Sequence, residues 1–401
     1  MQPSKNNLIV LASTFPARAN DGTPAFVQDL AEQEAKSFNV TVLTPMVPGA
    51  ARRETVGNIQ VVRYRYFFKK FEDLADGAIL DNLKANKARL LQVPPMFVGL
   101  GTALRKLVHE LEPVAIHAHW VIPQGLVASV VAPKVPLLVT THGGDIYALN
   151  QKPLLSLKKR VFRHAKHVTT VNSQMKQSLI GFGLPAEKVS VLPMGVDTGL
   201  VREIRKTAKK VDGQVLVVGR LVEKKGIEFL FEAMRKLQAE GKLERKGKPA
   251  MRLKVIGDGP IRSALETAAK GLPVEFMGQQ GRDTVLRTIA ESEIMVIPSV
   301  TAESGDQEDL PVTLLEGGAG AIATIASNLP GINEVVVNGV SGILTEQRDV
   351  KAIAAALDEL LQDAKLRSKY AAGLEAAVAQ YDIEIVGRKY SEQLLAIATS
   401  S

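Results

Sequence analysis

The sequence predicts an α/β protein made of two Rossmann-like, doubly wound parallel sheets in series. Short β-rich runs alternate with helical patterns along the whole chain of 401 residues. Runs such as Leu8–Ala12 and Val215–Val218 are apolar on both faces, which is typical of parallel strands covered by helices on both sides. The alternation starts again after Met194–Asp197, so two sheets are favoured over one large sheet.

The expected strands are short and evenly distributed over the two halves. Those of the first half are Leu8–Ala12, Val40–Leu43, Ile59–Tyr64, Ala115–Ala118, Leu137–Thr141, Val168–Val171 and Val189–Leu192. Those of the second half are Val215–Val218, Leu253–Ile256, Val274–Met277, Ile294–Ile297 and Ala323–Ala326. Helices are expected between them, for example over Gly226–Leu237, where apolar residues recur at the spacing of one helical face.

These patterns predict a domain of residues 1–195 and a second domain of residues 196–381. The basic stretch Arg202–Lys210 follows the boundary. Ligands of such sheets bind beyond the carboxyl ends of the strands, and two facing sheets would therefore place both ligand edges on one cleft.

The amino-acid composition indicates in which cellular compartment the protein is expected. Apolar residues make up 46% and charged residues 23% of the chain, as in folded soluble proteins. There is no cysteine, which excludes disulfides and thiolate metal sites and favours a reducing compartment. The apolar run Leu8–Ala12 is too short for a signal peptide, and the uncharged stretch Pro113–Pro133 contains polar residues unsuited to a membrane span. A cytoplasmic location is expected.

The net charge of +8 is concentrated in the first half. Residues 1–195 hold 23 Lys/Arg and 13 Asp/Glu, a balance of +10, and the remainder holds 27 and 29, a balance of −2. This surface is either simply solvated or attracts anionic lipid heads or phosphorylated acceptors. Segment Arg63–Lys70 interleaves cations with aromatic residues, which suits the inner face of a membrane. Nucleic acid is not expected as a partner, since no helix-turn-helix, aromatic platform or basic repeat is found.

The first chemical motif is Val217–Gly226, at the end of a predicted strand and the start of a helix. Gly219 lets the backbone approach a ligand, and Arg220 and Lys225 add two cations beside the helix N-terminus. This combination indicates an anion site suited to a diphosphate. The alternative is an ordinary basic surface loop.

Two further motifs follow strands of the second half. Gly257-Asp258-Gly259-Pro260 is interpreted as a tight turn in which Pro260 opens a helix, because a dinucleotide fingerprint needs glycine where Arg262 stands. The segment from Glu308 to Glu316 follows the strand that ends at Ile297. Its two carboxylates can accept hydrogen bonds from two sets of hydroxyls, one on a sugar and one on a ribose.

Histidines and glycines mark the strand ends of the first half. His142 follows a buried strand on a glycine-rich loop, where it either meets a ligand or caps the loop. His117 and His119 lie on one strand, but no third ligand of suitable spacing follows, so we expect no metal site. Residues 20–24, including Gly22, form a turn whose amides either meet a phosphate or only cap the next helix.

Taken in this order, the motifs resemble the retaining glycosyltransferases of the GT-B fold, specifically glycosyltransferase family four. The resemblance implies that Arg220 and Lys225 hold the donor diphosphate, with Gly219 and Gly22 near the phosphates. It also implies that Glu308 contacts the transferred sugar and Glu316 the ribose; Asp309 and Leu310, between them, are expected in the same donor site. His142 would lie near the donor sugar and acceptor, and the terminal helix from about Asp382 to residue 401 would cross back to the first domain.

The expected function is transfer of a sugar from a nucleotide-diphosphate sugar to a glycan or lipid-linked acceptor, in polysaccharide or glycolipid biosynthesis. No Asp-x-Asp motif occurs, and cations with helix N-termini can stabilise the leaving diphosphate without metal, so no cofactor is expected. Two departures from the family pattern concern loop shape: Ala321 and Ala323 replace a Gly and a Pro, and Asn333 stands where Pro is common. The alternatives are a nicotinamide oxidoreductase and a non-catalytic, sugar-nucleotide-binding partner of a transferase.

Overall fold

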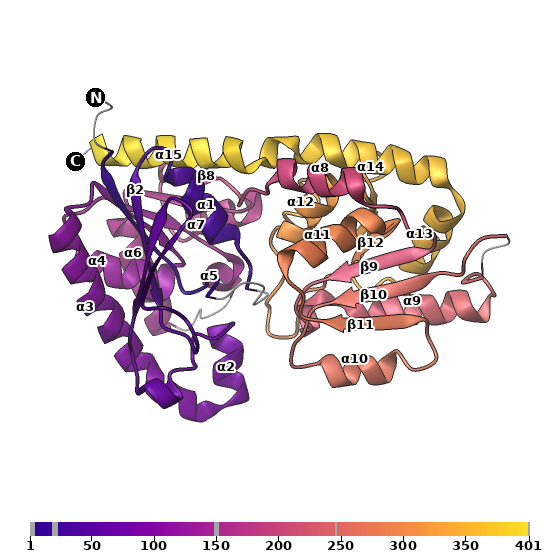
Figure 1. The fold of residues 1–401 in the computed structure, drawn as a ribbon, viewed down its shortest axis with the longest axis horizontal. Coiled ribbons are helices and arrows are strands. Elements are labelled where there is room, and N and C mark those ends of the chain that lie inside the picture. Colours follow the sequence, from indigo (N-terminus) through magenta and orange to yellow (C-terminus); the bar gives the residue numbers. More distant parts are fainter. Residues whose placement is uncertain (1–4, 18–22, 148–151, 245–246, 400–401) are drawn as a thin grey trace. The chain divides into compact units, whose positions relative to one another are not determined.

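The computed structural model describes residues 5–17, 23–147, 152–244 and 247–399. The chain divides into two compact units. The N-terminal unit comprises Met1–Gly195 and Ile383–Ser401, and the C-terminal unit comprises Val196–Asp382 (Figure 1). None of the described helices combines the length and apolar character that crossing a bilayer requires.

The N-terminal unit is built on an eight-stranded sheet in the order β3-β4-β2-β1-β5-β6-β7-β8. Every neighbouring pair is parallel except β3 and β4, which are antiparallel. The strands are β1 (Asn7–Leu11), β2 (Asn39–Pro45), β3 (Arg53–Val56), β4 (Ile59–Tyr64), β5 (Ala115–His119), β6 (Leu137–Thr140), β7 (His167–Thr170) and β8 (Val189–Val191). The order reverses between β1 and β5, which makes their carboxyl ends the ligand-binding point of a doubly wound sheet.

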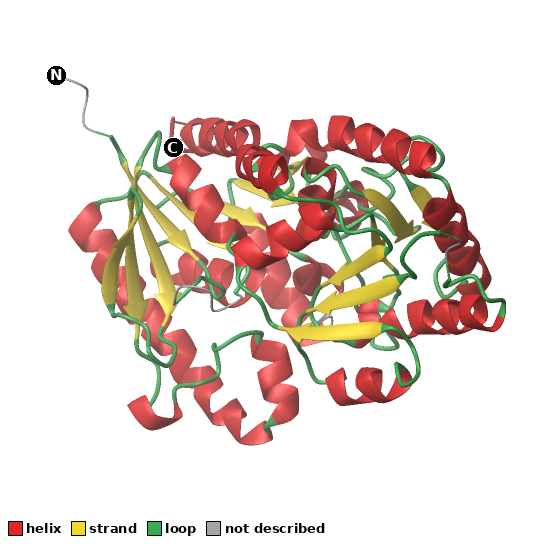
Figure 2. Cartoon of the chain, turned by 45° about the vertical axis from the view of Figure 1, so that its right-hand side comes forward, coloured by secondary structure: helices red, strands yellow, loops and turns green. Residues whose placement is uncertain are grey.

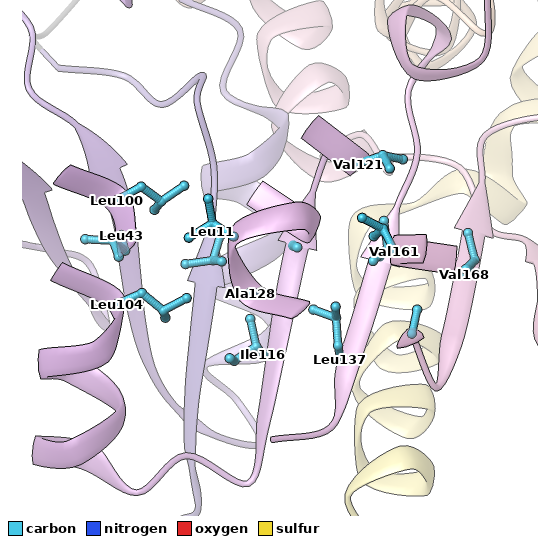
Figure 3. Close-up of a cluster of buried hydrophobic side chains, with 14 of the residues drawn as sticks. Leu11, Leu43, Leu100, Leu104, Ile116, Val121, Ala128, Leu137, Val161 and Val168 are labelled. Carbon is cyan, nitrogen blue, oxygen red and sulfur yellow. The ribbon is translucent and has the colours of Figure 1, made fainter. Parts of the chain in front are cut away.

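Helices cover both faces of this sheet (Figure 2). Ile9, Leu11 and Ile116 pack in one buried cluster with residues of the helices α3 (Val93–Leu111), α4 (Leu126–Val131) and α6 (Lys152–His164) (Figure 3). The opposite face of β5 meets α1 (Phe26–Glu34) and α15 (Ile383–Thr399). The remaining elements are α2 (Ile79–Ala85), α5 (Gly143–Tyr147), α7 (Ser173–Gly181), and the short turns η1 (Lys69–Phe71), η2 (Lys87–Gln92), η3 (Val121–Gly125) and η4 (Ala186–Lys188).

The C-terminal unit contains a six-stranded parallel sheet in the order β11-β10-β9-β12-β13-β14. The strands are β9 (Gln214–Val218), β10 (Arg252–Ile256), β11 (Val274–Gly278), β12 (Ile294–Ile297), β13 (Ala323–Ser327) and β14 (Ile343–Thr345). The order reverses between β9 and β12. This is the same doubly wound plan as in the N-terminal unit.

Alternate residues of the C-terminal strands enter different layers. Val215 and Val217 of β9 pack with α9 (Ile227–Ala239), α10 (Arg262–Ala268) and α13 (Val350–Gln362). Leu216 packs on the other side with α8 (Thr198–Thr207), α11 (Arg282–Glu291), α12 (Val312–Ala319) and α14 (Ala364–Val378). The turns η5 (Glu223–Lys225) and η6 (Ala379–Tyr381) complete the unit. The predicted α/β architecture with two parallel sheets is confirmed.

Candidate functional site

The carboxyl ends of β9 and β12 bring two chemically distinctive loops together in the C-terminal unit. The loop after β9 carries Gly219, Arg220 and Lys225, and the loop after β12 carries Glu308. The two strands are neighbours, and their outgoing connections run to opposite sides of the sheet. Such a switch point opens a crevice at the strand ends, where a doubly wound sheet binds its ligand.

Close backbone contacts hold the two loops in register. The Val300 amide donates to the Lys224 carbonyl at 2.8 Å. Gly226 has a φ of +57°, and a Cβ there would lie 2.1 Å from the Pro298 carbonyl oxygen. Only glycine fits this position, for both reasons. The Glu303 amide adds a 2.8 Å hydrogen bond to the Glu223 carboxylate.

Lys225 and Glu308 form an ion pair at this crevice. The Lys225 Nζ lies 2.5 Å from the Glu308 Oε2, and the side chains are only 15% and 13% exposed. The stem of Lys225 crosses over Gly219, where an added Cβ would lie 2.9 Å from the lysine Cε. The charged end of Lys225 is therefore held near the strand end of β9, beside the loop after β12.

A second lysine reinforces the pair. Lys224 Nζ lies 3.2 Å from Asp306 Oδ1 and donates to the Gln307 carbonyl at 3.2 Å. Burial raises the pKa of Glu308, but the charges of Lys225 and then Lys224 oppose it, and the pKa lies below its ordinary value. Burial lowers the pKa of Lys224, but Glu308, Asp306 and Asp309 raise it above its ordinary value. The loop after β12 thus carries an ionised carboxylate beside two ammonium groups.

The other donor-site residues predicted in the C-terminal unit lie on the same two loops or on α12. Arg220 is exposed on the loop after β9, while Asp309 and Leu310 are half-buried in the loop before α12. Glu316 is half-buried within α12, on the second turn of the helix. Gly22 lies outside the described residues.

The carboxyl ends of β5 and β6 in the N-terminal unit carry a cluster of histidines. His142 Nε2 lies 3.4 Å from His119 Nδ1, and the ring centroids of His119 and His117 are 4.4 Å apart. Trp120 and Phe26 complete an aromatic wall, with centroids 4.6 Å and 5.4 Å from that of His142. Trp120 has a φ of +74°, an uncommon conformation that clusters at functional sites.

Asp145 fixes the backbone around His142. Its Oδ2 accepts the His142 amide at 3.0 Å, and its Oδ1 accepts the Val121 amide at 2.9 Å. Burial raises the pKa of Asp145 to about 7, against the lowering effects of these amides and of Lys158. Burial and then the charge of His117 lower the pKa of His142 to about 3. His142 is therefore neutral at physiological pH, as suits a group that donates or accepts a hydrogen bond.

A buried polar chain lies beneath this cluster. His117 bonds to Glu34 Oε1 through Nδ1 and to Thr140 Oγ1 through Nε2, both at 2.7 Å. His117 also stacks on Tyr390 of α15, whose hydroxyl donates to the Leu192 carbonyl at 2.7 Å. The two strand histidines thus belong to a hydrogen-bonded layer. No group of three potential metal ligands occurs among the residues that the structure describes.

Comparison with known families identifies the chain. Residues 20–200 match the family model "Glycosyltransferase Family 4", and residues 202–374 match the model "Glycosyl transferases group 1". The chain thus carries two glycosyltransferase domains, the first matched by family 4 and the second by group 1. Each model matches one half of the chain. The histidine cluster lies in the region matched by the first model, and Lys225 and Glu308 lie in the region matched by the second.

Relatives of this chain include biosynthetic glycosyltransferases. The amylovoran biosynthesis glycosyltransferase AmsK of Erwinia amylovora is 31% identical over 55% of this chain. The match spans 54% of that relative, about half of its length. Sucrose-phosphate synthase from Thermosynechococcus elongatus has a TM-score of 0.79 at 18% identity, covering 99% of this chain and 100% of that one.

A second solved structure, Anabaena Alr3699/HepE in complex with UDP-glucose, has a TM-score of 0.70 at 17% identity. It covers 98% of this chain and 100% of the other. These likenesses assign the GT-B fold to the chain.

Several features of the two sites were not predicted from the sequence. The roles of Lys224 and Asp145 were not predicted, although Lys224 directly precedes Lys225 and Asp145 lies three residues after His142. The partner of His117 was also missed, because Glu34 is 83 residues away on α1. A buried acidic residue on the apolar face of α1 was the one sequence signal that could have revealed it.

The loops that depart from the family pattern keep well-defined shapes. Ala321 has a φ of +48° directly after α12, and the Ile322 amide donates to the Gly317 carbonyl at 3.2 Å. This is the left-handed helix ending that glycine usually occupies. Asn333 donates its amide to the Leu329 carbonyl at 3.0 Å, a bond that proline would lack. Contrary to expectation, Pro260 does not open a helix, because α10 begins at Arg262 after a turn.

Proposed function

We propose that the protein transfers a sugar from a nucleoside-diphosphate sugar to a glycan or lipid-linked acceptor, with retention of the anomeric configuration. The observation that carries this proposal is the placement of Lys225 and Glu308 together at the β9/β12 switch point. A cation suits the donor diphosphate and a carboxylate suits the sugar hydroxyls. The Anabaena structure supports the donor class, since it is described with UDP-glucose.

In this proposal the protein mainly stabilises the departing diphosphate. Arg220 and Lys225 offset the negative charge that develops as the bond from sugar to phosphate breaks, without a resident metal or cofactor. Glu316 accepts a hydrogen bond from the ribose, and Asp309 and Leu310 shape the donor pocket. His142, held neutral, contributes hydrogen bonds to the donor sugar or the acceptor. The diphosphate itself helps to remove the acceptor proton.

The experiment is a panel of UDP-, GDP- and ADP-sugars, first by thermal shift and then by turnover. A binding donor raises the melting temperature by mass action. Enzymatic activity then requires release of the nucleoside diphosphate and an acceptor product whose anomeric configuration is read by NMR. Binding without any turnover would support the alternative, a non-catalytic partner of a transferase. An inverted product would contradict retention.

The acceptor side is proposed to approach an anionic membrane, at the cytoplasmic face. The structure corrects the predicted patch Arg63–Lys70: Arg63 is 1% exposed and paired with Glu54, and Tyr64 and Tyr66 are buried. The end of that segment, residues 68–70, is exposed, and further exposed apolar residues follow it in the chain. An apolar tip is formed by Phe68, Phe71, Leu80, Leu90 and Leu91, with the exposed cations Lys69, Lys70, Lys84 and Lys87 among them.

Internal hydrogen bonds tie together the segments that carry the apolar tip. Asp73 accepts from Arg89 at 2.6 Å and from Gln92 at 2.8 Å, which ties the segment around η1 to η2. Asn82 of α2 donates to the Leu74 carbonyl at 3.0 Å. Aromatic and aliphatic side chains interspersed with lysines suit an interface with anionic headgroups. This supports a lipid-linked acceptor over a freely diffusing one.

A further inference from the structure

The ion pair between Lys225 and Glu308 joins two residues with different assignments in the proposed function. Lys225 is assigned to the donor diphosphate and Glu308 to the transferred sugar. In the structure the two side chains form an ion pair, with 2.5 Å between the Lys225 Nζ and the Glu308 Oε2. A bound diphosphate would interact with the ammonium group of Lys225, and the hydroxyl groups of a bound sugar would interact with the carboxylate of Glu308.

The surroundings of the pair leave few substitutes for either partner. Glu308 is 13% exposed, so water reaches its carboxylate poorly. Lys224 is nearby, but its ammonium group is already bonded to Asp306 and the Gln307 carbonyl. The backbone of both loops is fixed by the Val300–Lys224 hydrogen bond and by the contact of Gly226 with Pro298. The carboxylate therefore cannot easily move toward a new cation.

Electrostatics then distinguish two ligands. A nucleoside diphosphate that takes Lys225 leaves a poorly hydrated carboxylate without its nearest counter-charge, and a buried charge that loses its partner is costly. An intact nucleotide sugar takes Lys225 as well, but its hydroxyl groups donate to Glu308 and restore the lost interactions. The unpaired Glu308 carboxylate thus weakens binding of the nucleoside diphosphate, whether as product or as free nucleotide, and weakens binding of the donor much less.

We propose that Glu308 makes the site select the intact nucleotide sugar over the nucleoside diphosphate, because it holds Lys225 unless a sugar hydroxyl takes the lysine's place. This inference rests on the proposed function. It assigns Glu308 a second role beside sugar contact, in which it also favours release of the product after the sugar has left. Such an exchange requires no conformational change of the backbone. Only the interaction partners of the Lys225 and Glu308 side chains change.

The test compares affinities for matched ligands by isothermal titration calorimetry. The ligand pairs are UDP and UDP-glucose, GDP and GDP-mannose, and ADP and ADP-glucose, with inorganic pyrophosphate as a probe that has neither sugar nor base. In Glu308→Gln the diphosphate and pyrophosphate should bind about five- to tenfold more tightly, since Lys225 is released from the carboxylate. The preference for the nucleotide sugar over the diphosphate should fall by at least as much.

Two further variants make the result specific. Asp306→Asn removes a nearby negative charge that pairs with Lys224, and it should change diphosphate affinity by less than about twofold. In the Lys225→Ala background, Glu308→Gln should no longer improve diphosphate binding. Melting temperatures of all variants report whether the fold is kept.

The outcomes separate the two proposals. If the protein binds a nucleotide pair but Glu308→Gln leaves diphosphate and pyrophosphate affinity unchanged or weaker, the exchange is overturned while the proposed function stands. An equal gain from Asp306→Asn would also overturn it, because general charge would then be the cause. If no nucleotide or nucleotide sugar binds the wild-type protein, both proposals fail.

Discussion

Gly257 lies against the backbone of Gly219, so closely that a Cβ on Gly257 would be 1.9 Å from the Gly219 carbonyl oxygen. The φ of Gly257 is +140°, a conformation that residues with a side chain rarely adopt. The loops after β9 and β10 therefore touch backbone to backbone. Gly257 of the Gly-Asp-Gly-Pro motif thus supports the loop that carries Lys225.

Gly257→Ala should lower the free energy of unfolding by about 2 kcal/mol or more, since both the contact and the φ oppose a side chain. Gly271→Ala is the matched control. Its φ is +81°, but no heavy atom lies within 4 Å of an added Cβ, so only the strain of about 1 kcal/mol applies. Denaturant titration measures both. Equal losses would show that the contact with Gly219 contributes nothing.

Ala321→Gly should stabilise the protein by about 0.5–1 kcal/mol. Ala321 occupies the left-handed region at +48°, where alanine pays a steric cost of about 1–2 kcal/mol that exceeds the extra backbone entropy glycine loses on folding. The Ala323→Gly substitution, inside β13, serves as the control and should destabilise. A loss of stability in Ala321→Gly, measured by thermal or denaturant unfolding, would contradict this account of the helix ending.

Glu316→Ala should weaken nucleoside-diphosphate binding by about 1.5–3 kcal/mol, the value of a hydrogen bond to a charged group. The ribose is present in donor and product alike, so the Michaelis constant of the donor should rise as well. Calorimetry with the nucleotide that binds the wild type measures the effect. A variant that loses melting temperature but binds the nucleotide normally would assign Glu316 a structural role only.

Acidification should destabilise the N-terminal unit partly through His142. Its pKa falls from 6.5 to about 3 on folding, so the unfolded chain binds more protons between these values and stability is lost as pH falls below 6.5. His142→Gln should reduce that loss, by at most about 1.4 kcal/mol per pH unit. Unfolding titrations of both proteins at pH 5 and pH 7 provide the comparison. An identical loss in the variant would mean that His142 is protonated in the native state.

Asp145 has the opposite effect on the pH dependence of stability, and this effect is present in the wild type and in His142→Gln alike. Its pKa is raised from 3.8 to about 7, so the folded protein binds the extra proton and stability falls as pH rises through that window. His142→Gln should therefore be compared with the wild type at each pH, and not across pH within one protein.

Binding to anionic vesicles should depend on the apolar tip. Lys69→Gln with Lys70→Gln should weaken co-sedimentation by about 1 kcal/mol per lysine, and binding of the wild type should fall as salt rises. Lys134→Gln with Lys166→Gln removes the same charge from two other exposed sites of the N-terminal unit and should have little effect. Equal binding to neutral and anionic vesicles, or none to either, would refute membrane docking.

Most strands were predictable because buried parallel strands have a continuous apolar signal. Ile59–Tyr64 and Ile294–Ile297 were predicted with their observed bounds. Two strands were missed. Arg53–Val56 is a polar edge strand and Ile343–Thr345 has only three residues, so neither carries the apolar run that marks a covered strand.

The residues of the candidate site were predicted one by one, and their roles stay predictions; the arrangement of Lys225 and Glu308 was not predicted. Strand ends identified Lys225 and Glu308 separately, since ligand-binding residues of such sheets follow strands. That the two side chains pair depends on the path of the loop between Ile297 and Val312, which is set by contacts with Lys224 and Gly226. The local sequence pattern of either loop does not predict those long-range contacts.

The N-terminal unit is discontinuous in the chain, because Tyr390 of α15 stacks on His117 while residues 196–382 form the other unit. During synthesis, the ribosome must therefore produce the whole C-terminal unit before it supplies the helix that covers the histidine layer. The C-terminal unit is a continuous segment and can fold as soon as it emerges. The first unit to be translated is thus the last to be completed. Until α15 is added, the polar residues around His117, which are buried in the finished protein, stay accessible to solvent and to chaperones.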